Sequence, residues 1–338
     1  VCLAAVDVAR FAFAGDRSEL RSLQRALALN PFDVPVRTAI ARVQAERGEV
    51  GAAIVTLKEA VAIDPYDVAA DRALAKLLLE SGRYEEAYQH HKTMYGKVPA
   101  DVDTLVNYGT LAARFGHDSD AIEVLQRALA MDERQPLAHL ELAEALSRSN
   151  RTAEAIPHFE RYIGLVAERP DAIADLESFA GVLIDTGDAY VVEKKASQAA
   201  TYYARAVDFA EQGGKPAIEG TAYARLAAVL DAAGKTQDAV DAYRRAIDRS
   251  AVAGDKAAAA GAWYNYSQLI AKHGAPPRLV VACLLAAREG SASDPGPQFD
   301  AANAALAKYE DRLPGISTAT QKELPKALDD ARAFTPAP

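Results

Sequence analysis

The side chains best suited to chemistry in this sequence are its histidines and its two cysteines. Metal sites need such ligands at close, defined spacings, and nucleophilic catalysis needs its Ser or Cys in a recognisable turn. Here His90 and His91 are adjacent, His117 follows much later, and Cys2 and Cys283 lie at opposite ends. The sequence contains no metal-spaced Cys/His set, Gly-rich phosphate loop or nucleophile elbow. We therefore predict no catalytic residue, no metal site and no cofactor.

Each of these residues also has a simpler structural interpretation. His91 falls at a helix-packing position, which favours a packed imidazole over a metal ligand. His139 and His158 fall on the two helices of one predicted repeat and are interpreted in the same way. The two cysteines are predicted to be small unpaired hydrophobes, because an extended array keeps its ends apart. Carboxylates are spread over the whole chain, so no pair of them indicates a site.

The composition narrows the class of partner. The chain has 338 residues, a formal net charge of -9 and a pI near 5.3. Nucleic acids and anionic membrane surfaces require a basic face, so we expect neither as the main partner. The stretch 1–14 is apolar but is interrupted by Asp7 and Arg10, so it is not a spanning helix as it stands. It is compatible with a membrane tether through a segment upstream of Val1.

A 34-residue period predicts the fold. The segment Glu-Ala-Val-Ala-Ile-Asp-Pro-Tyr at 59–66 recurs at 25–32 and, more loosely, at 92–99 and 127–132. A fixed period of this size is typical of stacked helical repeats, whose units pack only on their neighbours.

One repeat is predicted to hold two amphipathic helices, from about Pro35 to Arg47 and from about Val50 to Ile63. Gly48 separates them, because glycine adopts the left-handed conformation at low energy. Glycine returns at this position as Gly82, Gly116, Gly234 and Gly274, and once as Asn150. Small residues recur in the second helices, where the axes of neighbouring helices must approach to about 8–10 Å. They are Ala26, Ala53, Ala60, Ala87, Ala121, Ala128, Ala155, Ala199, Ala206, Ala239, Ala246 and Ala286.

This pattern resembles the tetratricopeptide repeat. The matching residues are Ala41, Ala53, Ala60 and Pro65 in one unit, Ala75, Ala87 and Pro99 in the next, and Gly109, Ala121 and Ala128 in a third. The resemblance implies an all-α fold, a right-handed α-solenoid superhelix of about eight helix-turn-helix repeats. We predict that residues 1–169 form about five repeats with the 34-residue period. After 170 the period becomes 40 residues, giving about three repeats to 290, and residues 291–338 form a helical cap and tail. Within the cap, we expect helices at 298–313 and 318–334, broken by Pro314-Gly315.

The same resemblance implies a concave surface lined by the first helix of each repeat. Read onto this chain, the first block offers Arg42, Arg72, Lys76, Asp103, Asn107, Thr110, Glu144 and Ser147. The second block offers Asp188, Ala224, Arg225, Ala228, Tyr264, Asn265 and Gln268. From these we predict partner-binding roles for Arg42, Arg72, Lys76, Asn107, Thr110, Tyr264, Asn265 and Gln268. Trp263, beside Tyr264, is expected to pack between helices.

The basic members of this set could hold a carboxylate or an acidic peptide. Arg72, Lys76 and Asn107 partly resemble the clamp by which some members of the family hold an acidic chaperone tail. Leu137 and Glu141 stand where that clamp has its last two cations, and Glu141 would repel a carboxylate. A solvated helix face is the alternative interpretation of these residues.

We predict from these observations a non-catalytic scaffold or adaptor that binds a partner polypeptide, as part of a larger assembly. One alternative is the soluble tail of a larger membrane enzyme, such as a glycan polymerase or ligase, with its catalytic part upstream of Val1. Another is an accessory subunit of a multi-protein membrane complex. The sequence leaves the compartment open between periplasm and cytoplasm.

Overall fold

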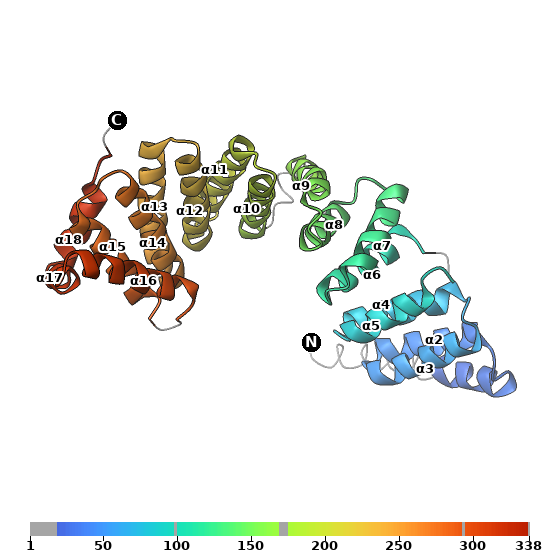
Figure 1. The fold of residues 1–338 in the computed structure, drawn as a ribbon. Helices are drawn as coiled ribbons and strands as arrows, with labels where there is room; N and C mark the ends of the chain where they lie inside the picture. Colours follow the sequence, from blue (N-terminus) through green and yellow to red (C-terminus); the bar gives the residue numbers. More distant parts are fainter. Residues whose placement is uncertain (1–18, 98–99, 169–174, 293–294, 337–338) are drawn as a thin grey trace, which may run out of the picture. The chain divides into compact units, whose positions relative to one another are not determined.

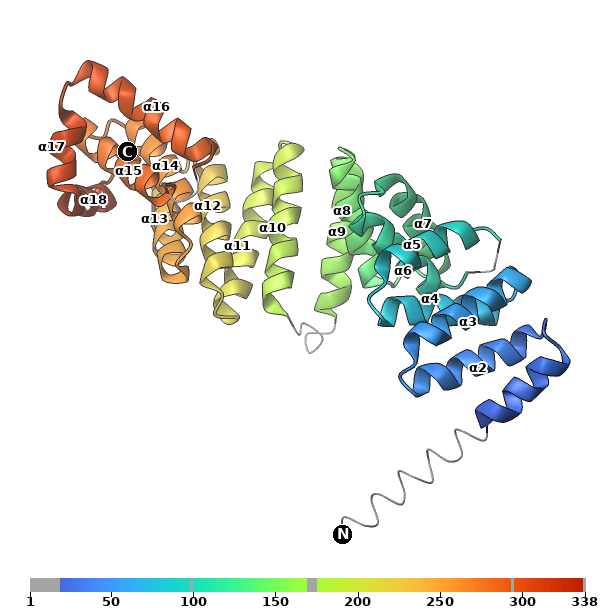
Figure 2. The ribbon, with the colours of Figure 1, turned by 90° about the horizontal axis from the view of Figure 1, so that it is seen from below.

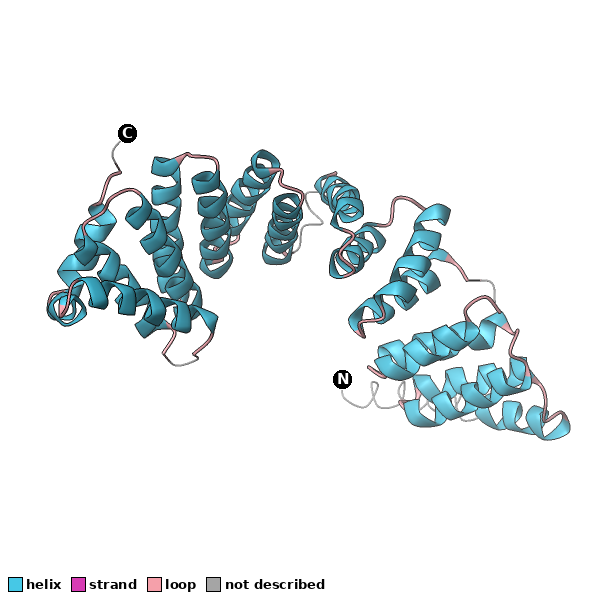
Figure 3. Ribbon diagram, in the orientation of Figure 1, coloured by secondary structure: helices cyan, strands magenta, loops and turns pink. Residues whose placement is uncertain are grey.

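The computed structural model describes residues 19–97, 100–168, 175–292 and 295–336. Every regular element in these residues is a helix, and none of them forms a strand (Figure 3). The chain divides into two compact units, Val1–Ser149 and Asn150–Pro338. The all-α fold predicted from the sequence is therefore confirmed. The change of period predicted at 169–170 lies outside the described residues, so the predicted domain boundaries, the number of repeats and the right-handed superhelix stay predictions.

The first unit is a row of antiparallel helix pairs (Figure 1). Consecutive helices pack on each other, and the first helices of neighbouring pairs also touch, α2 with α4 and α6 with α8. The second predicted helix of the first complete repeat, Val50–Ile63, has the observed bounds. Residues 19–29 are helical and precede α2 (Val34–Glu46), α3 (Val50–Ile63), α4 (Val68–Glu80), α5 (Tyr84–Met94), α6 (Val102–Arg114), α7 (Asp118–Met131) and α8 (Pro136–Arg148).

The second unit contains longer helices, in keeping with its longer period. Each of α10 to α14 has 17 or 18 residues, against 11 to 14 in α2 to α8. The elements are α9 (Thr152–Ala167), α10 (Leu176–Val192), α11 (Ala196–Gln212), α12 (Pro216–Ala232), α13 (Thr236–Ala253), α14 (Lys256–Lys272), α15 (Pro277–Gly290), α16 (Pro297–Arg312), α17 (Ile316–Lys322) and α18 (Leu324–Ala333).

The turns and seams follow the repeat pattern. Gly48 has φ 78°, and Asn150, which replaces glycine at this position in a later repeat, has φ 58°. Both are therefore left-handed, as predicted for a residue that ends the first helix of a repeat. Most of the recurring alanines of the second helices, such as Ala53 and Ala128, have no exposed surface. Ala26 is exposed and Ala286 is only half-buried, so these two do not form closed seams. Gly109 and Gly187 stand at even tighter seams, where a methyl group would lie 2.4 Å from side-chain carbon atoms of Leu125 and Tyr203, respectively.

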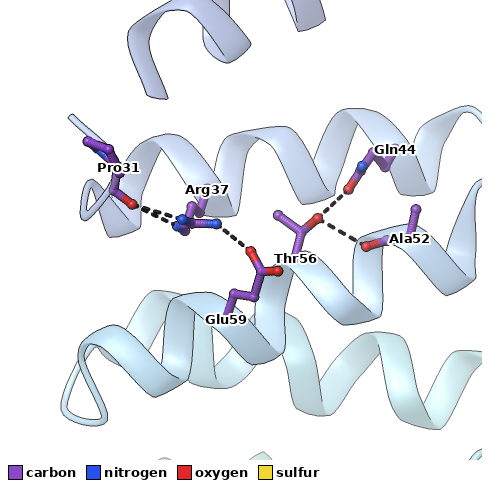
Figure 4. A network of polar contacts seen from close by, with 6 residues as sticks. All are labelled: Pro31, Arg37, Gln44, Ala52, Thr56 and Glu59. Carbon is purple, nitrogen blue, oxygen red and sulfur yellow. Dashed lines mark hydrogen bonds and ion pairs between the residues drawn. The ribbon is translucent and has the colours of Figure 1, made fainter. Parts of the chain in front are cut away.

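Polar contacts tie the two helices of the first complete pair to the turn before them (Figure 4). The Arg37 guanidinium of α2 donates to the carbonyl oxygen of Pro31, at 2.8 Å from one nitrogen, and also pairs with Glu59 of α3. One turn away, the Thr56 hydroxyl of α3 donates to Gln44 Oε1 of α2 at 2.9 Å. Arg37 thus links α2 to the preceding turn and to α3, and the contact of Thr56 joins α2 to α3 a second time.

The C-terminal helices gather around α15 (Figures 1 and 2). α16, α17 and α18 all pack on α15, and Ala327 and Ala331 of α18 are fully buried. The Tyr266 hydroxyl of α14 donates to the carbonyl oxygen of Ala331 at 2.7 Å. We predicted a single helix at 318–334, and this was wrong, because the chain breaks at Glu323 into α17 and α18. Pro325 in the first turn of α18 explains the break, since proline cannot donate to the helix before it.

Candidate functional site

A groove of about 550 Å³ lies between α2 and α4 in the first unit. Small side chains form its floor because both helices carry alanine at the positions that face the gap between them. Charged side chains form its rim. We call this the α2–α4 groove. We use floor for its small and aliphatic lining residues, Ala39, Ala41, Ala45, Leu57, Ala69, Ala73 and Leu77, and rim for its charged lining residues, Arg42, Glu46, Asp67, Lys76 and Glu80. Ala41 and Leu57 are buried, and Ala69 is exposed.

The predicted cations of this region are already paired within the chain. Arg42 binds Glu46 and Glu19, each at 2.7 Å, and these hydrogen bonds raise the pKa of its guanidinium. Lys76 lies 3.7 Å from Glu80. A partner's carboxylate over Arg42 or Lys76 would therefore have to replace a carboxylate of this chain, so these cations alone do not make a site for a uniformly acidic tail.

The other predicted residues of the first unit do not enter the groove. Arg72 points toward the start of α6, where it pairs with the N-cap residue Asp101 at 3.0 Å. Asn107 is exposed on α6, and the Thr110 hydroxyl oxygen is buried without a hydrogen-bond partner among the described residues. Burial, followed by the nearby charge of Glu144, raises the pKa of Glu141 to about 7. Glu141 is therefore only partly ionised at neutral pH and repels a carboxylate less than we expected from the sequence.

A second groove, of about 320 Å³, lies between α10 and α12 in the second unit. Arg225 and Asp188 line it, and the Tyr203 hydroxyl donates to Asp188 at 2.5 Å. Both helices again supply small or β-branched residues, including Val191 and Ala228. Three residues that the repeat pattern predicted for the concave face of this unit, Asp188, Arg225 and Ala228, therefore line the same groove.

The aromatic cluster predicted later in this unit has a different environment. Trp263 is buried, as predicted, and Arg332 of α18 stacks over its ring at 5.3 Å. Tyr264 is half-buried, and Asn265 and Gln268 are exposed on α14. None of these last three residues lines the two grooves described above. Their predicted binding roles stay predictions.

Two of the histidines, His90 and His91, lie in a cluster between α4, α5 and α6. His90 Nε2 lies 2.8 Å from Asp71 Oδ1, and both side chains are largely buried. His91 is 5% exposed and stacks on Tyr108, and its Nε2 has no partner among the described residues. Burial, and then the charge of His90, lowers the pKa of His91 to about 4. His91 is thus the packed histidine that we predicted. In the described part of the chain, no three His, Cys, Asp or Glu residues are grouped to hold a metal ion.

Comparison with known proteins agrees with the repeat pattern. Residues 45–94 and 108–173 match two family descriptions, both of the tetratricopeptide repeat. The chain therefore contains tetratricopeptide repeats. No curated protein matches the chain significantly.

Solved structures of tetratricopeptide-repeat proteins resemble this one at low sequence identity. The C-terminal part of a tetratricopeptide-repeat protein from Cytophaga hutchinsonii is 19% identical, with a TM-score of 0.54 over 82% of this chain and 99% of that one. This likeness shows the fold. YrrB, described as having an unusual peptide-binding site, is 18% identical, with a TM-score of 0.46 over 55% of this chain and 91% of its own. MamA is 21% identical, with a TM-score of 0.43 over 52% of this chain and 97% of its own.

Tetratricopeptide-repeat proteins typically mediate protein–protein interactions, and their scaffold is typically non-catalytic. None of the helices in the described residues is long and apolar enough to span a bilayer. The two membrane-linked functions considered from the sequence stay hypotheses. We did not predict the alanine floor of the α2–α4 groove, because Ala39, Ala45, Ala69 and Ala73 lie outside the small positions that the repeat pattern identified. These alanines lie on the first helices, away from the small positions that the family buries, and this placement could have indicated that they line a groove.

Proposed function

We propose that this protein is a non-catalytic scaffold that binds a polypeptide segment of a partner in the α2–α4 groove, within a larger assembly. The observation that supports this most is the groove itself. Its floor is apolar, its rim carries both signs of charge, and it lies between the first helices of two neighbouring repeats. Grooves of this composition accept an amphipathic helix or an extended segment through its apolar side chains.

The composition of the floor favours a polypeptide over a small molecule. Small-molecule sites place a few polar groups so that they converge on the ligand and fix its orientation. Here the floor is mainly alanine and leucine side chains, and the charged groups at the rim pair with each other, as Arg42 does with Glu46. Such a floor gives contact area to inserted side chains and little directional hydrogen bonding.

Site-specific photo-crosslinking tests this proposal. A benzophenone amino acid placed at Ala73 reports on the groove, because Ala73 lines it and is half-buried. The same amino acid at Ala52, an exposed residue of α3 outside the groove, is the matched control. In cells that express the gene naturally, we expect discrete crosslinked proteins from position 73 and not from position 52. Identical crosslinking patterns at the two positions, or none at position 73, would reject the groove as a binding site.

A further inference from the structure

The first helices of the first unit carry two rows of side chains whose charge changes sign along the unit. The rows lie one helical turn apart, and successive members of each row are 34 residues apart. The first row reads cation, cation, hydroxyl, carboxylate, and the second reads carboxylate, carboxylate, cation, cation. In chain order, the first row is Arg42, Lys76, Thr110 and Glu144, and the second is Glu46, Glu80, Arg114 and Arg148.

The ion pairs between the rows are oriented oppositely at the two ends. Arg42 and Lys76 reach forward to Glu46 and Glu80, at 2.7 and 3.7 Å. In α8 the order is reversed, because the carboxylate of Glu144 precedes Arg148, 3.6 Å away. The two charges therefore cancel within α2, α4 and α8, but the pair points one way in α2 and α4 and the other way in α8. In α6 the two positions hold the hydroxyl of Thr110 and the cation of Arg114.

Helix stability does not explain this arrangement. Carboxylates in the last turn of a helix oppose its macrodipole, whereas cations there are favourable. Glu46 and Glu80 end α2 and α4, which have no basic residue in their last turns. Arg114 and Arg148 end α6 and α8 in the favourable sense. The unfavourable carboxylates thus lie where the α2–α4 groove is, and they remain more than half exposed.

We propose that the segment bound along these helices reverses its own charge along its length. This rests on the proposed function. A segment that follows the first row is acidic over Arg42 and Lys76 and basic over Glu144. A segment that follows the second row is basic over Glu46 and Glu80, and it is acidic over Arg114 and Arg148. Either path requires one sign over the α2–α4 groove and the other sign over α8, with apolar side chains in the groove.

Segments with a single sign of charge fit these two rows of side chains less well. A wholly acidic tail meets Glu144 on the first path and two carboxylates on the second. A wholly basic tail meets Arg42 and Lys76 on the first path, and Arg114 and Arg148 on the second. Charge complementarity of this kind sets the register and direction of a bound segment more than its affinity.

Selection from a displayed library of random 16-residue peptides tests the inference with the full-length chain. We compare the wild type with Ala73→Trp, which fills the groove, and with Ala52→Trp, which adds the same bulk on α3. The third variant is the exchange K76E/E80K. It keeps the composition and the ion pair of α4, and the described residues contain no other ion pair or hydrogen bond of these two side chains. Thermal melts of the variants establish that each is folded.

We expect peptides whose binding weakens at least about tenfold in Ala73→Trp and is unchanged in Ala52→Trp. Their consensus should carry opposite net charges in its two halves, and K76E/E80K should weaken them by about tenfold. Groove-dependent peptides with a single sign of charge, or peptides indifferent to the K76E/E80K exchange, would overturn the charge reversal and leave the groove as a binding site. A selection with no groove-dependent peptides would overturn both.

Discussion

At the scale of single residues, the positions that decide packing are those where a methyl group makes a difference. Gly187 of α10 faces the Tyr203 ring, and the Tyr203 hydroxyl is itself held by Asp188. The ring therefore has little freedom to move away. Gly181 on the same helix has nothing within 4 Å of where a methyl group would stand. The two glycines have the same helical backbone and opposite surroundings.

This contrast predicts opposite effects of the same substitution. Gly187→Ala should destabilise the second unit by about 1–3 kcal/mol, because the added methyl group overpacks the seam. Gly181→Ala should be neutral or stabilising by up to about 1 kcal/mol, because alanine favours the helix. Thermal unfolding of the two variants measures this difference. Equal changes in their melting temperatures would show that the seam relaxes freely around Tyr203.

His91 predicts a pH dependence of stability. Its pKa is about 4 in the folded chain, below the ordinary value of 6.5, so between these values the unfolded chain binds a proton that the folded chain does not. Stability should therefore be unaffected above pH 6.5 and fall toward pH 4, by up to about 3 kcal/mol from this residue. Asp71 and His90 face the same cluster and stay unchanged in His91→Leu. That variant should lose less stability than the wild type between pH 7 and pH 4.5, whereas parallel curves would contradict the role of His91.

At this scale the sequence indicated some of the side chains that line the α2–α4 groove and none of their contacts between repeats. Arg42 and Lys76, which the repeat register predicted to lie on the concave face, both line the α2–α4 groove, and their binding roles stay predictions. Their pairing with Glu46 and Glu80 was readable from the i,i+4 spacing, but we did not use it. The contacts of Arg42 with Glu19 and of Arg72 with Asp101 cross between repeats. They depend on how neighbouring helices are placed, which spacing alone does not give.

At the scale of the helices, an aspartate N-cap recurs in the first unit. Asp33, Asp67 and Asp101 each accept a hydrogen bond from the amide three residues on, at 2.9, 2.7 and 2.9 Å. The corresponding residue before α8 is Gln135, which makes no such bond. The caps satisfy amides that the helix itself leaves without partners.

Loss of one cap should lower stability mainly in the first turn of the helix that it caps. Asp33→Ala should destabilise the start of α2 by about 1 kcal/mol, which corresponds to about fivefold faster amide hydrogen exchange there. Asp33→Asn keeps a side-chain acceptor and should exchange nearly like the wild type. Exchange rates of the α2 amides, followed residue by residue, measure the effect. Equal acceleration in both variants would assign it to the lost charge and not to the cap.

The helix boundaries show where the sequence was sufficient. The bounds of α3 were predicted to the residue, because glycine precedes it and Asp64-Pro65 follows it. The break between α17 and α18 was missed because the apolar spacing runs on through it and Pro325 was not weighed. Tertiary packing of both short helices on α15 stabilises what neither would form alone.

At the scale of the whole molecule, the C-terminal helices close the end of the second unit. Cys283 of α15 has no exposed surface, and burial raises the pKa of its thiol. Arg332 of α18 holds the cover in place through Asp248, at 3.3 Å, and the ring of Trp263. The thiol is therefore a reporter of whether α18 is docked.

Thiol labelling should detect the loss of this cover. In a Cys2→Ser background, Cys283 should resist a thiol reagent, and deletion of residues 324–338 should speed labelling at least about tenfold. Arg332→Ala should give an intermediate rate, because it removes two contacts and leaves α18 in place. Asp329→Ala, an exposed residue of the same helix, is the control and should behave like the wild type. Unchanged labelling after the deletion would mean that other elements bury the thiol.

The regular return of aspartate caps and left-handed glycines has an evolutionary consequence. The 34-residue segments that begin at Asp33, Asp67 and Asp101 each carry their own cap and their own left-handed glycine, so their boundaries are set by nearby residues. An in-frame duplication or loss of one such segment would keep every junction of the remaining ones intact. Genes of this kind can therefore lengthen or shorten by recombination while the encoded chain still folds, and the row of first helices grows or shrinks by one helix at a time.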